Sequence, residues 1–408
     1  MPADRNGCRL PTLTRVSLGS DVFGEQGGRN DLVRRHNLAL VLRRVHVAPA
    51  TRSELTRVSG LNRSTIGALV AELVDRGLVV EDEAAGAGQV GRPSPLVRPS
   101  DVPIAVAVNP ELDAVTVATV RLGGRVLAKE RVPFDAPPTP DEAVAVAVDT
   151  ARRLLARSNG ARLVGAGIAV PGVVRRVDGL VRLAPHLGWR DVPIAAMVGE
   201  ALGVFAGAAN DAGLGAQAEW VFGAGRGVED LVYVHGGASG VGGGIVSGGA
   251  LVGGATGHAG ELGHIGIRRG GRADTIGVRG TLESEVRRSA LLEVLGLDRA
   301  DPDELEAALT ADRSSPVRAE VRRQIDALAV ALASVINLLN PSRIVLGGFL
   351  SALTAATPGR LADMVATRAL PLPDEPVDIR RAALGSDLLL IGAAELPFTR
   401  LFADPLPA

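Results

Sequence analysis

Cysteine, aromatic residues and lysine are all scarce in this chain of 408 residues. Cys8 is the only cysteine, which excludes an intrachain disulfide and a metal cluster held by several thiolates. A single cysteine is typical of the reducing cytosol, so we expect a cytoplasmic protein. Aromatic residues make up 2% of the chain, and Lys129 is its only lysine. This bias is typical of a GC-rich genome and carries no information about the fold.

Long hydrophobic segments are also missing. Residues 1–29 contain charges and glycines but no continuous apolar stretch, so they do not predict a signal peptide. They carry no motif that we can interpret, and we expect a disordered tail. The longest uncharged run, 231–260, contains twelve glycines and two histidines. It predicts strands joined by glycine turns, and we expect no association with a membrane.

The length and the charge distribution indicate more than one domain. A chain of 408 residues exceeds what one hydrophobic core usually supports. Residues 1–99 contain fourteen arginines against ten acidic residues, whereas the remaining 309 residues contain thirty basic and thirty-five acidic residues. A mildly basic N-terminal part therefore precedes an acidic body.

Three helices are predicted in the basic part. The first has apolar residues at helical spacing, namely Leu32, Val33, Leu38, Leu42 and Val45. Thr51 and Glu54 have the spacing of a capping box that starts a short second helix, and Gly60 suits the tight turn after it. The third helix starts at Asn62 and stops at Gly77. Two short helices joined by a glycine turn predict a helix-turn-helix.

The third helix and the segment after it carry the residue types that contact DNA. Its first turn contains Arg63, Ser64 and Thr65, which are cationic or small hydrogen-bonding residues suited to a major groove. Residues 78–100 read as strand, loop and strand, which predicts a wing. The expected DNA contacts are Arg52, Asn62, Arg63, Ser64, Thr65 and Arg92. The alternative is a three-helix packing module that binds no nucleic acid.

From residue 101 onward, short β-branched runs alternate with glycine turns and helices. Strands are expected at 104–108, 114–120 and 125–134, and a helix at 141–157. A second series follows, with helices near 281–296, 303–310 and 316–339 and strands at 343–348 and 377–384. This order predicts two α/β lobes with a cleft for a small ligand between them.

Five ordered segments give the body a resemblance to a known family. They are "VPGVVRRVDGLVRLAPHLGW", "ANDAGLGAQAEWVFGAGRG", "GASGVGGGIVSGGALVGGATGHAGELGH", "GVRGTLE" and "INLLNPSRIVLGG". The sequence resembles the ROK family of repressors, open reading frames and sugar kinases, and its N-terminal part resembles the winged helix of that family's repressors. The resemblance implies a winged helix-turn-helix (α+β) followed by a two-lobed α/β actin-like, ribonuclease H-like domain.

The resemblance also implies how the chain is divided. We expect an N-terminal tail over residues 1–29 and the DNA-binding domain over 30–100. The first lobe is expected over 101–211, joined by a C-terminal helix at 386–408. The second lobe is expected over 212–385, with the sugar site and a dimer surface.

The same resemblance implies a sugar site made of Asn210, Asp211, Glu261, His264 and Glu283. Asp211 takes the position of the general base in the family's kinases. Carboxylates, an amide and an imidazole that converge can satisfy the donors and acceptors of vicinal hydroxyls. Family members commonly hold a structural zinc with the motif histidine and three cysteines, but Asp274, Ile276 and Thr281 stand at those cysteine positions. Isoleucine cannot bind zinc, so we expect none.

The phosphate loop of the family's kinases departs further from the pattern. Its "DxGGT" sequence aligns with residues 109–113, where Asn109 replaces the aspartate, Glu111 and Leu112 replace the two glycines, and Glu111 adds a negative charge. A carboxylate there repels phosphate, so ATP is not expected to bind. The second glycine turn, 237–244, is retained and could bind an anion.

These features favour a sugar-responsive transcriptional repressor that is not an enzyme. Its expected partners are operator DNA, a sugar or sugar phosphate effector, and further copies of itself in a homodimer or tetramer. The alternatives are an ATP-dependent sugar kinase with an accessory DNA-binding domain, which the intact Asp211 supports, and a DNA-binding protein whose body only dimerises.

Overall fold

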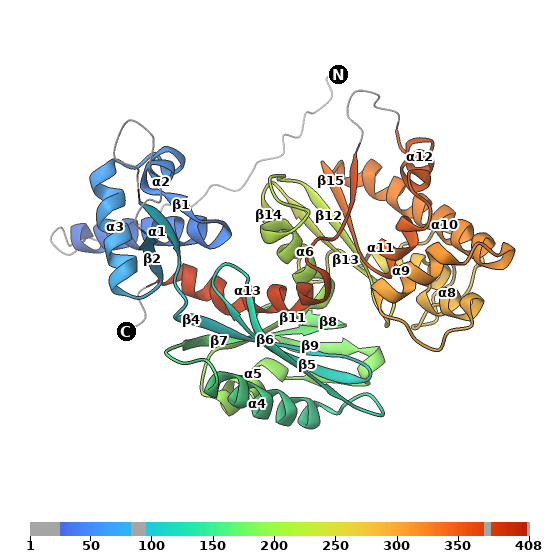
Figure 1. Ribbon diagram of the computed structural model, residues 1–408, viewed down its shortest axis with the longest axis horizontal. Helices are drawn as coiled ribbons and strands as arrows, with labels where there is room; N and C mark the ends of the chain where they lie inside the picture. The colour runs from blue at the N-terminus through green and yellow to red at the C-terminus, as the bar shows by residue number, and fades with distance from the viewer. Residues whose placement is uncertain (1–24, 83–94, 371–376, 406–408) are drawn as a thin grey trace, which may run out of the picture.

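The computed structural model describes residues 25–82, 95–370 and 377–405. An N-terminal domain lies beside two α/β lobes, and the last helix runs between them (Figure 1). Among the described helices, none combines the length and apolar content that a membrane span requires.

The N-terminal domain contains three helices and a small antiparallel sheet. The helices are α1 (Glu25–Val47), α2 (Arg52–Ser59) and α3 (Arg63–Asp75), and the strands are β1 (Ala50–Thr51), β2 (Val79–Asp82) and β3 (Leu96–Pro99), in the order β1-β3-β2. The predicted capping box is present, because Thr51 Oγ1 accepts a hydrogen bond from Glu54 N at 3.2 Å and Glu54 Oε2 accepts one from Thr51 N at 2.7 Å. Gly60 closes α2 with a φ of 69°.

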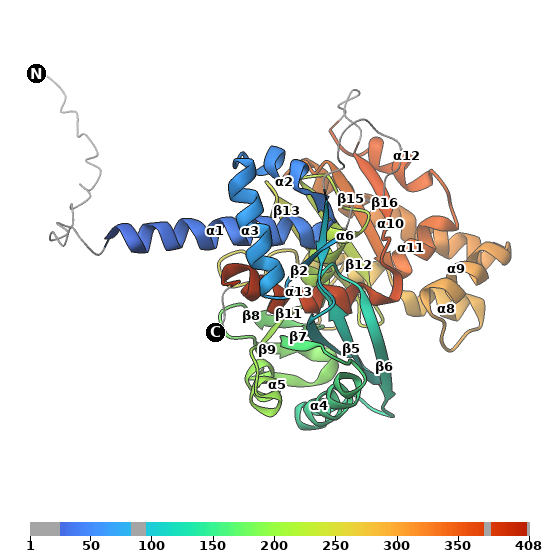
Figure 2. The same cartoon turned by 60° about the vertical axis from the view of Figure 1, so that its left-hand side comes forward.

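The apolar stripe predicted on the first helix is only partly buried. Leu38, Leu42 and Val45 lie in the core, but Leu32 and Val33 are 67% and 59% exposed. Only three of the five apolar residues at helical spacing therefore face the core. Figure 2 shows the reason, because the N-terminal part of α1 extends beyond the helices and sheet that it packs on.

The first lobe is a five-stranded sheet covered on both faces. Its strands are β4 (Pro103–Pro110), β5 (Ala114–Arg121), β6 (Val126–Pro133), β7 (Arg162–Val170) and β11 (Ala206–Asn210), in the order β11-β7-β4-β5-β6. Helices α4 (Pro140–Ala156) and α5 (Ile194–Leu202) share a core with one face, and α13 (Leu388–Ala403) packs on the other. A small antiparallel sheet holds β8 (Val173–Arg175), β9 (Leu180–Ala184) and β10 (Trp189–Val192).

The second lobe repeats this plan. Its strands are β12 (Leu231–Gly236), β13 (Val241–Ser247), β14 (Ala250–Leu251), β15 (Arg343–Gly348) and β16 (Asp378–Arg381), in the order β14-β13-β12-β15-β16. Helix α6 (Asp211–Phe222) packs on one face. The other side carries α7 (Leu282–Glu285), α8 (Arg288–Leu295), α9 (Pro302–Ala311), α10 (Ser315–Leu339), α11 (Phe349–Ala355) and α12 (Arg360–Ala366). Two α/β lobes are thus present, as predicted.

The helix expected near residues 281–296 is interrupted. Helix α7 ends at Glu285 and α8 begins at Arg288, with extended backbone at Val286 between them. The side chain of Gln324 explains the break, since its amide accepts a hydrogen bond from Arg287 N at 3.1 Å and donates one to Arg287 O at 2.9 Å. A buried glutamine thus satisfies backbone groups that a continuous helix would have paired.

Candidate ligand site and nucleic-acid interface

The carboxyl ends of three parallel strands meet at one edge of the first sheet. Asn210, at the end of β11, pairs with Val170 at the end of β7, and Val108 of β4 pairs with Ile168 of β7. The turn at 109–113 and the start of α6 therefore lie at the same edge. In open α/β sheets this is the edge where ligands bind.

Asn210 and Asp211 begin α6 at this edge. Asn210 is the N-cap, with its Oδ1 accepting from Gly213 N at 2.9 Å and its Nδ2 donating to Gly172 O at 3.0 Å. Asp211 accepts a hydrogen bond from Ala212 N at 2.7 Å. Burial raises the pKa of Asp211 to about 7, and the negative charge of Glu261 adds to the rise. The carboxyl group is therefore poised to accept or donate near neutral pH.

The glycines of β13 explain why Glu261 comes within electrostatic range of Asp211. A Cβ on Gly244 would lie 2.4 Å from Ala216 Cβ of α6, and one on Gly243 would lie 2.5 Å from Leu262 Cδ1. Only hydrogen fits at these positions, so α6 and the segment after Gly260 can both close on this strand. The retained glycine run is thus required by packing, whether or not an anion binds near it.

Glu261 lies at the start of the short turn Leu262–His264 and is exposed to solvent over part of its surface. Partial burial raises its pKa, and the nearby imidazoles of His264 and His258 oppose that rise. Glu283 adds a further negative charge to the group. The side chain of Glu283 fills the space beside Gly240, where a Cβ would lie 2.6 Å from its Oε2. Glu283 also accepts a hydrogen bond from Thr275 Oγ1 at 3.2 Å.

A buried aspartate organises the loop at 268–280. Asp274 Oδ2 accepts hydrogen bonds from His264 Nδ1 and from Thr281 Oγ1, each at 3.1 Å. Asp274 Oδ1 accepts from the backbone N–H groups of Ile276 at 3.1 Å and Val278 at 2.8 Å. Although burial alone would raise the pKa of Asp274, these hydrogen bonds lower it overall. The loop is held by hydrogen bonds that converge on one carboxylate.

Asp211 thus lies within electrostatic range of Glu261, and Glu261 in turn lies near His264 and Glu283. His264 is shared with the loop through Asp274. His264, Asp274 and Glu283 each offer a ligand atom within 4.8 Å of the others, a spacing that could also hold a metal ion. The hydrogen bonds from His264 and Thr281 already satisfy Asp274 without one. A polyol that meets Asn210, Asp211 and Glu261 would find acceptors and an amide donor at one place.

Side chains of the first lobe close the turn at the phosphate-loop position. Glu111 Oε1 accepts from Thr116 Oγ1 at 2.6 Å, and Glu111 N donates to Ala114 O at 2.7 Å. Arg131 donates to Asp113 Oδ1 at 2.7 Å and to Glu111 Oε2 at 3.4 Å. The backbone amide of Glu111 is therefore occupied, and this turn presents two carboxylates that share one arginine.

The residues expected to contact DNA fall into three groups. Arg63 and Ser64 are exposed in the first turn of α3, and within the described part of the chain Arg63 has no hydrogen-bond or ion-pair partner. Asn62 caps α3, with its Oδ1 accepting from Thr65 N at 2.8 Å and from Ser64 Oγ at 2.7 Å. Arg52 and Arg92 form the remaining group.

Arg52 is engaged inside the domain, and Arg92 lies outside the described residues. The guanidinium of Arg52 makes a two-point pair with the carboxylate of Glu81, at 2.5 Å for each bond. This pair joins α2 to β2. A phosphate contact by Arg52 would have to compete with it, and stays a prediction.

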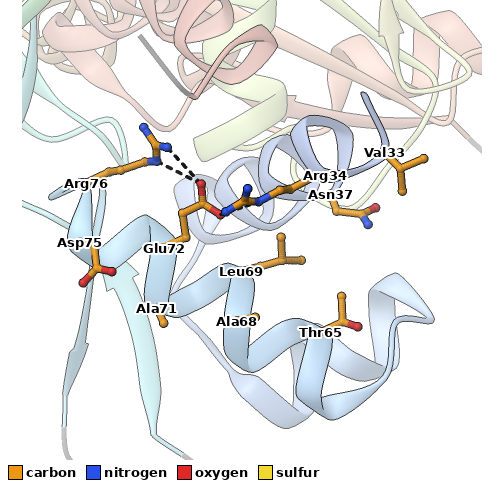
Figure 3. A pocket seen from close by; sticks show the side chains of 10 residues that line it. All are labelled: Val33, Arg34, Asn37, Thr65, Ala68, Leu69, Ala71, Glu72, Asp75 and Arg76. Carbon is orange, nitrogen blue, oxygen red and sulfur yellow. Dashed lines mark hydrogen bonds and ion pairs between the residues drawn. The ribbon is translucent and has the colours of Figure 1, made fainter. Parts of the chain in front are cut away.

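A groove of about 760 Å³ is lined by residues of α1 and α3 (Figure 3). Thr65 lines one end of it, and Glu72 and Asp75 lie farther along α3. Glu72 binds Arg34 of α1 at 2.8 Å and Arg76 at 3.1 Å. Because Glu72 pairs with both arginines of this groove, Arg34 and Arg76, neither guanidinium is free for a phosphate, and the exposed first turn of α3 is the better candidate for DNA contact.

Sequence reasoning missed a polar pair between the N-terminal domain and the body. His46, at the end of α1, lies 2.9 Å from Glu395 of α13, and both side chains are buried. Glu395 is the only charged residue between Asp387 and Arg400 in an otherwise apolar helix. A charge at a core position is the signal that could have singled it out, but nothing local identified its partner.

Comparison with known proteins agrees with this architecture. The sequence pattern of the ROK family matches residues 107–399. A protein named "Xylose repressor" from Caldicellulosiruptor bescii is 24% identical over 340 residues, covering 78% of this chain and 84% of the relative. A "Glucokinase" from Streptomyces coelicolor is 30% identical over 300 residues, covering 67% of this chain and 90% of the relative.

A solved structure covers nearly the whole chain. It is described as a ROK family transcriptional regulator that is a homolog of the E. coli MLC protein, and it matches with a TM-score of 0.74 and 23% sequence identity. The match covers 91% of this chain and 98% of that structure, and at this identity it supports the fold alone.

Proposed function

Because the chain belongs to the ROK family, we propose that it is a sugar-responsive transcriptional repressor whose kinase-like body binds a sugar or sugar derivative without phosphorylating it. The N-terminal domain is a winged helix-turn-helix in this proposal, with α3 as the recognition helix and β2 and β3 as the strands of the wing. Relatives named as xylose repressors and the fold of a ROK regulator support this assignment.

The closed turn at 109–113 is the observation that carries the choice of sensor over kinase. A kinase holds phosphates with free backbone amides and neutralises their charge. Here Arg131 pairs with Asp113 and Glu111, so the local positive charge is already used. The proposed sugar residues Asn210, Asp211, Glu261, His264 and Glu283 are all retained. The protein is therefore proposed to bind neither ATP nor a structural zinc.

The proposed assembly follows from DNA geometry. A repressor that reads a near-palindromic site presents two recognition helices about one helical turn apart. A homodimer or tetramer of this chain would supply them. Sugar bound at the start of α6 would change the relative position of the lobes and the spacing of the two N-terminal domains.

Asp211 favours a second function, an ATP-dependent sugar kinase with an accessory DNA-binding domain. A carboxyl group with a pKa of about 7 suits a general base at neutral pH. Relatives named as glucokinases, at up to 30% identity, support this alternative. It requires nucleotide phosphates to displace the Arg131 contacts at the 109–113 turn.

Two assays on the purified full chain separate the two functions. A thermal-shift screen with sugars and sugar phosphates is expected to find a ligand that raises Tm. Incubation of that ligand with ATP and Mg²⁺ is expected to yield no phosphorylated product, with a ROK glucokinase as the positive control. Turnover at ordinary kinase rates, on the order of 1–100 per second, supports the kinase and overturns the repressor that only senses sugar. A screen without any hit favours a body that only dimerises.

A further inference from the structure

The junction between the N-terminal domain and the body is a built contact instead of a flexible linker. The buried apolar residues of α1, α2 and α3 form one continuous core with those of β4, β5 and α13. His46 lies at the centre of this junction and is 3% exposed. A movement of α13 therefore reaches α1 directly.

Hydrogen bonds hold the His46 ring between three segments. Gly123 N, in the turn between β5 and β6, donates to His46 Nδ1 at 2.9 Å. Since Nδ1 accepts a hydrogen bond, it carries no proton, and Nε2 is the nitrogen that donates to Glu395 Oε1 at 2.9 Å. One imidazole in one tautomer thus joins α1 to the β5–β6 turn and to α13.

Aromatic rings surround the same imidazole. Phe398 and Phe402 of α13 have ring centroids 5.5 and 4.9 Å from that of His46, and Phe222 lies at 5.1 Å in an edge-on arrangement. Phe222 is the last residue of α6. A Cβ on Gly124 would lie 2.8 Å from the Phe222 ring, so the β5–β6 turn accepts only glycine there. The ring is confined between the turn and His46.

Helix α6 therefore connects the candidate sugar site to His46. It begins with Asp211 at that site and ends with Phe222 against the imidazole, and its 12 residues are all helical. At 1.5 Å per residue such a helix is about 18 Å long, and it transmits displacement as a rigid body. Figure 1 shows α6 above the red helix α13, whose end approaches α1.

Helices α6 and α13 are tied to each other along their length. A Cβ on Gly392 of α13 would lie 2.4 Å from Leu214 O, so the two backbones are in contact. The buried carboxylate of Glu219 accepts hydrogen bonds from Ala383 N and Leu384 N, at 2.8 and 2.9 Å, in the segment that leads to α13. The pair can therefore move as one unit.

The path continues from His46 to the recognition helix. Helix α1 carries His46 near its C-terminal end and Arg34 farther back, and Arg34 binds Glu72 of α3 (Figure 3). Buried apolar residues of α1 and α3 share one core as well. Displacement of His46 along α1 therefore reorients α3.

We propose that Phe222 and His46 are the positioning residues that couple ligand binding at the start of α6 to the orientation of α3 on DNA. The inference rests on the proposed function and adds the route of its regulation. Typical couplings between two sites change affinity by about 5–150-fold, and the effect is reciprocal. Loss of the Phe222–His46 contact is expected to leave each binding event intact while it uncouples them.

The test compares Phe222→Leu and His46→Gln with the parent protein. Phe205→Leu is the matched control, because Phe205 contacts α13 through Arg400, which lies 4.6 Å above its ring. Operator affinity is measured by fluorescence anisotropy on DNA from upstream of the protein's own coding sequence, with and without the sugar that raises Tm. The two variants are expected to bind sugar and DNA within about threefold of the parent and to lose most of the sugar effect on DNA binding, whereas the control keeps it.

A second readout needs no sugar. By reciprocity, DNA binding to the parent is expected to change hydrogen–deuterium exchange in residues 211–222, and this change is expected to disappear in Phe222→Leu. If no sugar affects the parent but DNA still alters exchange in α6, the sugar-sensing function fails and the coupling route stands. Coupling retained at the parental level in both folded variants, or no effect of DNA on α6 in the parent, overturns the proposal.

Discussion

His264 Nδ1 lies 3.1 Å from the Asp274 carboxylate, and that carboxylate is completely buried. The side chain of Asp274 also accepts from Thr281 and from two backbone N–H groups of its own loop. At the loop where the family commonly binds zinc, the chain thus has a hydrogen-bonded carboxylate as its organising centre.

Replacement of Asp274 is expected to destabilise the protein, whereas treatment with a metal chelator is expected to have little effect. Asp274→Ala leaves four donors without their acceptor, and we expect a loss of about 2–4 kcal/mol in the free energy of unfolding. Asp149→Ala is the control, because the Asp149 carboxylate is exposed and lies 3.9 Å from Arg153. This variant is expected to change the free energy of unfolding by no more than about 0.5 kcal/mol. Zinc analysis of the untreated protein, with Tm before and after EDTA, completes the test. Stoichiometric zinc that EDTA removes with a drop in Tm would show that a metal ion, and not Asp274 alone, holds the loop.

The raised pKa of Asp211 predicts a pH dependence of stability. Its value of about 7 in the folded protein exceeds the ordinary value of 3.8, so the folded state holds the proton over this interval more tightly than the unfolded state. The protonated carboxyl group of Asp211 stabilises the folded state fully below pH 3.8, the ordinary pKa. This stabilisation is lost as the pH rises through about 7, the pKa in the folded protein. Asp211→Asn, which stays neutral, is therefore expected to gain stability relative to the parent as the pH increases from 5 to 8. Urea unfolding of ligand-free protein measures this difference, and a constant difference across that range would be inconsistent with the assigned pKa.

The packing of β13 on α6 predicts a large effect from one methyl group. Gly244→Ala would place its Cβ 2.4 Å from Ala216 Cβ, and we expect a loss of about 1–3 kcal/mol together with weaker sugar binding. Gly266→Ala is the matched control, since no atom lies within 4 Å of its added Cβ. Urea unfolding and a thermal-shift titration with the identified sugar check both variants. Equal stability of the two variants would show that α6 does not need this close approach.

Of two exposed arginines, Arg63 and Arg313, only Arg63 is expected to contribute to operator affinity. Arg63→Ala removes a cation from the first turn of α3 and is expected to weaken operator binding roughly 10–100-fold. Arg313→Ala, on the second lobe, removes the same charge from another exposed position and is expected to leave affinity unchanged. Anisotropy titrations over a range of salt concentrations measure both effects. An equal loss of operator affinity in the two variants would mean that the net charge of the protein, and not the position of Arg63 on α3, determines the effect.

The elements that follow local rules could be predicted from the sequence. The capping residues Thr51 and Asn62, the glycine stop at Gly60 and the apolar periodicity gave α2 and α3 nearly to the residue. The break at Val286 could not be foreseen, because the groups that satisfy it come from Gln324, far along the chain. Exposure of Leu32 depends on where the domain ends, which periodicity alone does not specify.

The functional residues likewise fall into those that the sequence indicates and those that only the fold brings together. Glu261 and His264 stand out in a glycine-rich segment, and the family pattern adds Asn210, Asp211 and Glu283. The pair His46 and Glu395 is separated by 349 positions, so only the fold brings it together. The sequence indicates that the glycine turn at 237–244 could bind an anion, and this stays a prediction. The fold adds that the glycines of β13 allow close packing on both faces of the strand.

In the proposed function, a sugar bound beside Asp211 controls DNA binding without being phosphorylated. The most direct measurement is an anisotropy titration of operator DNA with purified protein, with and without a saturating concentration of the sugar found by thermal shift, in the absence of ATP. We predict a change in operator affinity of at least about fivefold, abolished in Asp211→Ala. Identical affinities with and without a sugar that demonstrably binds would show that the sugar does not regulate DNA binding.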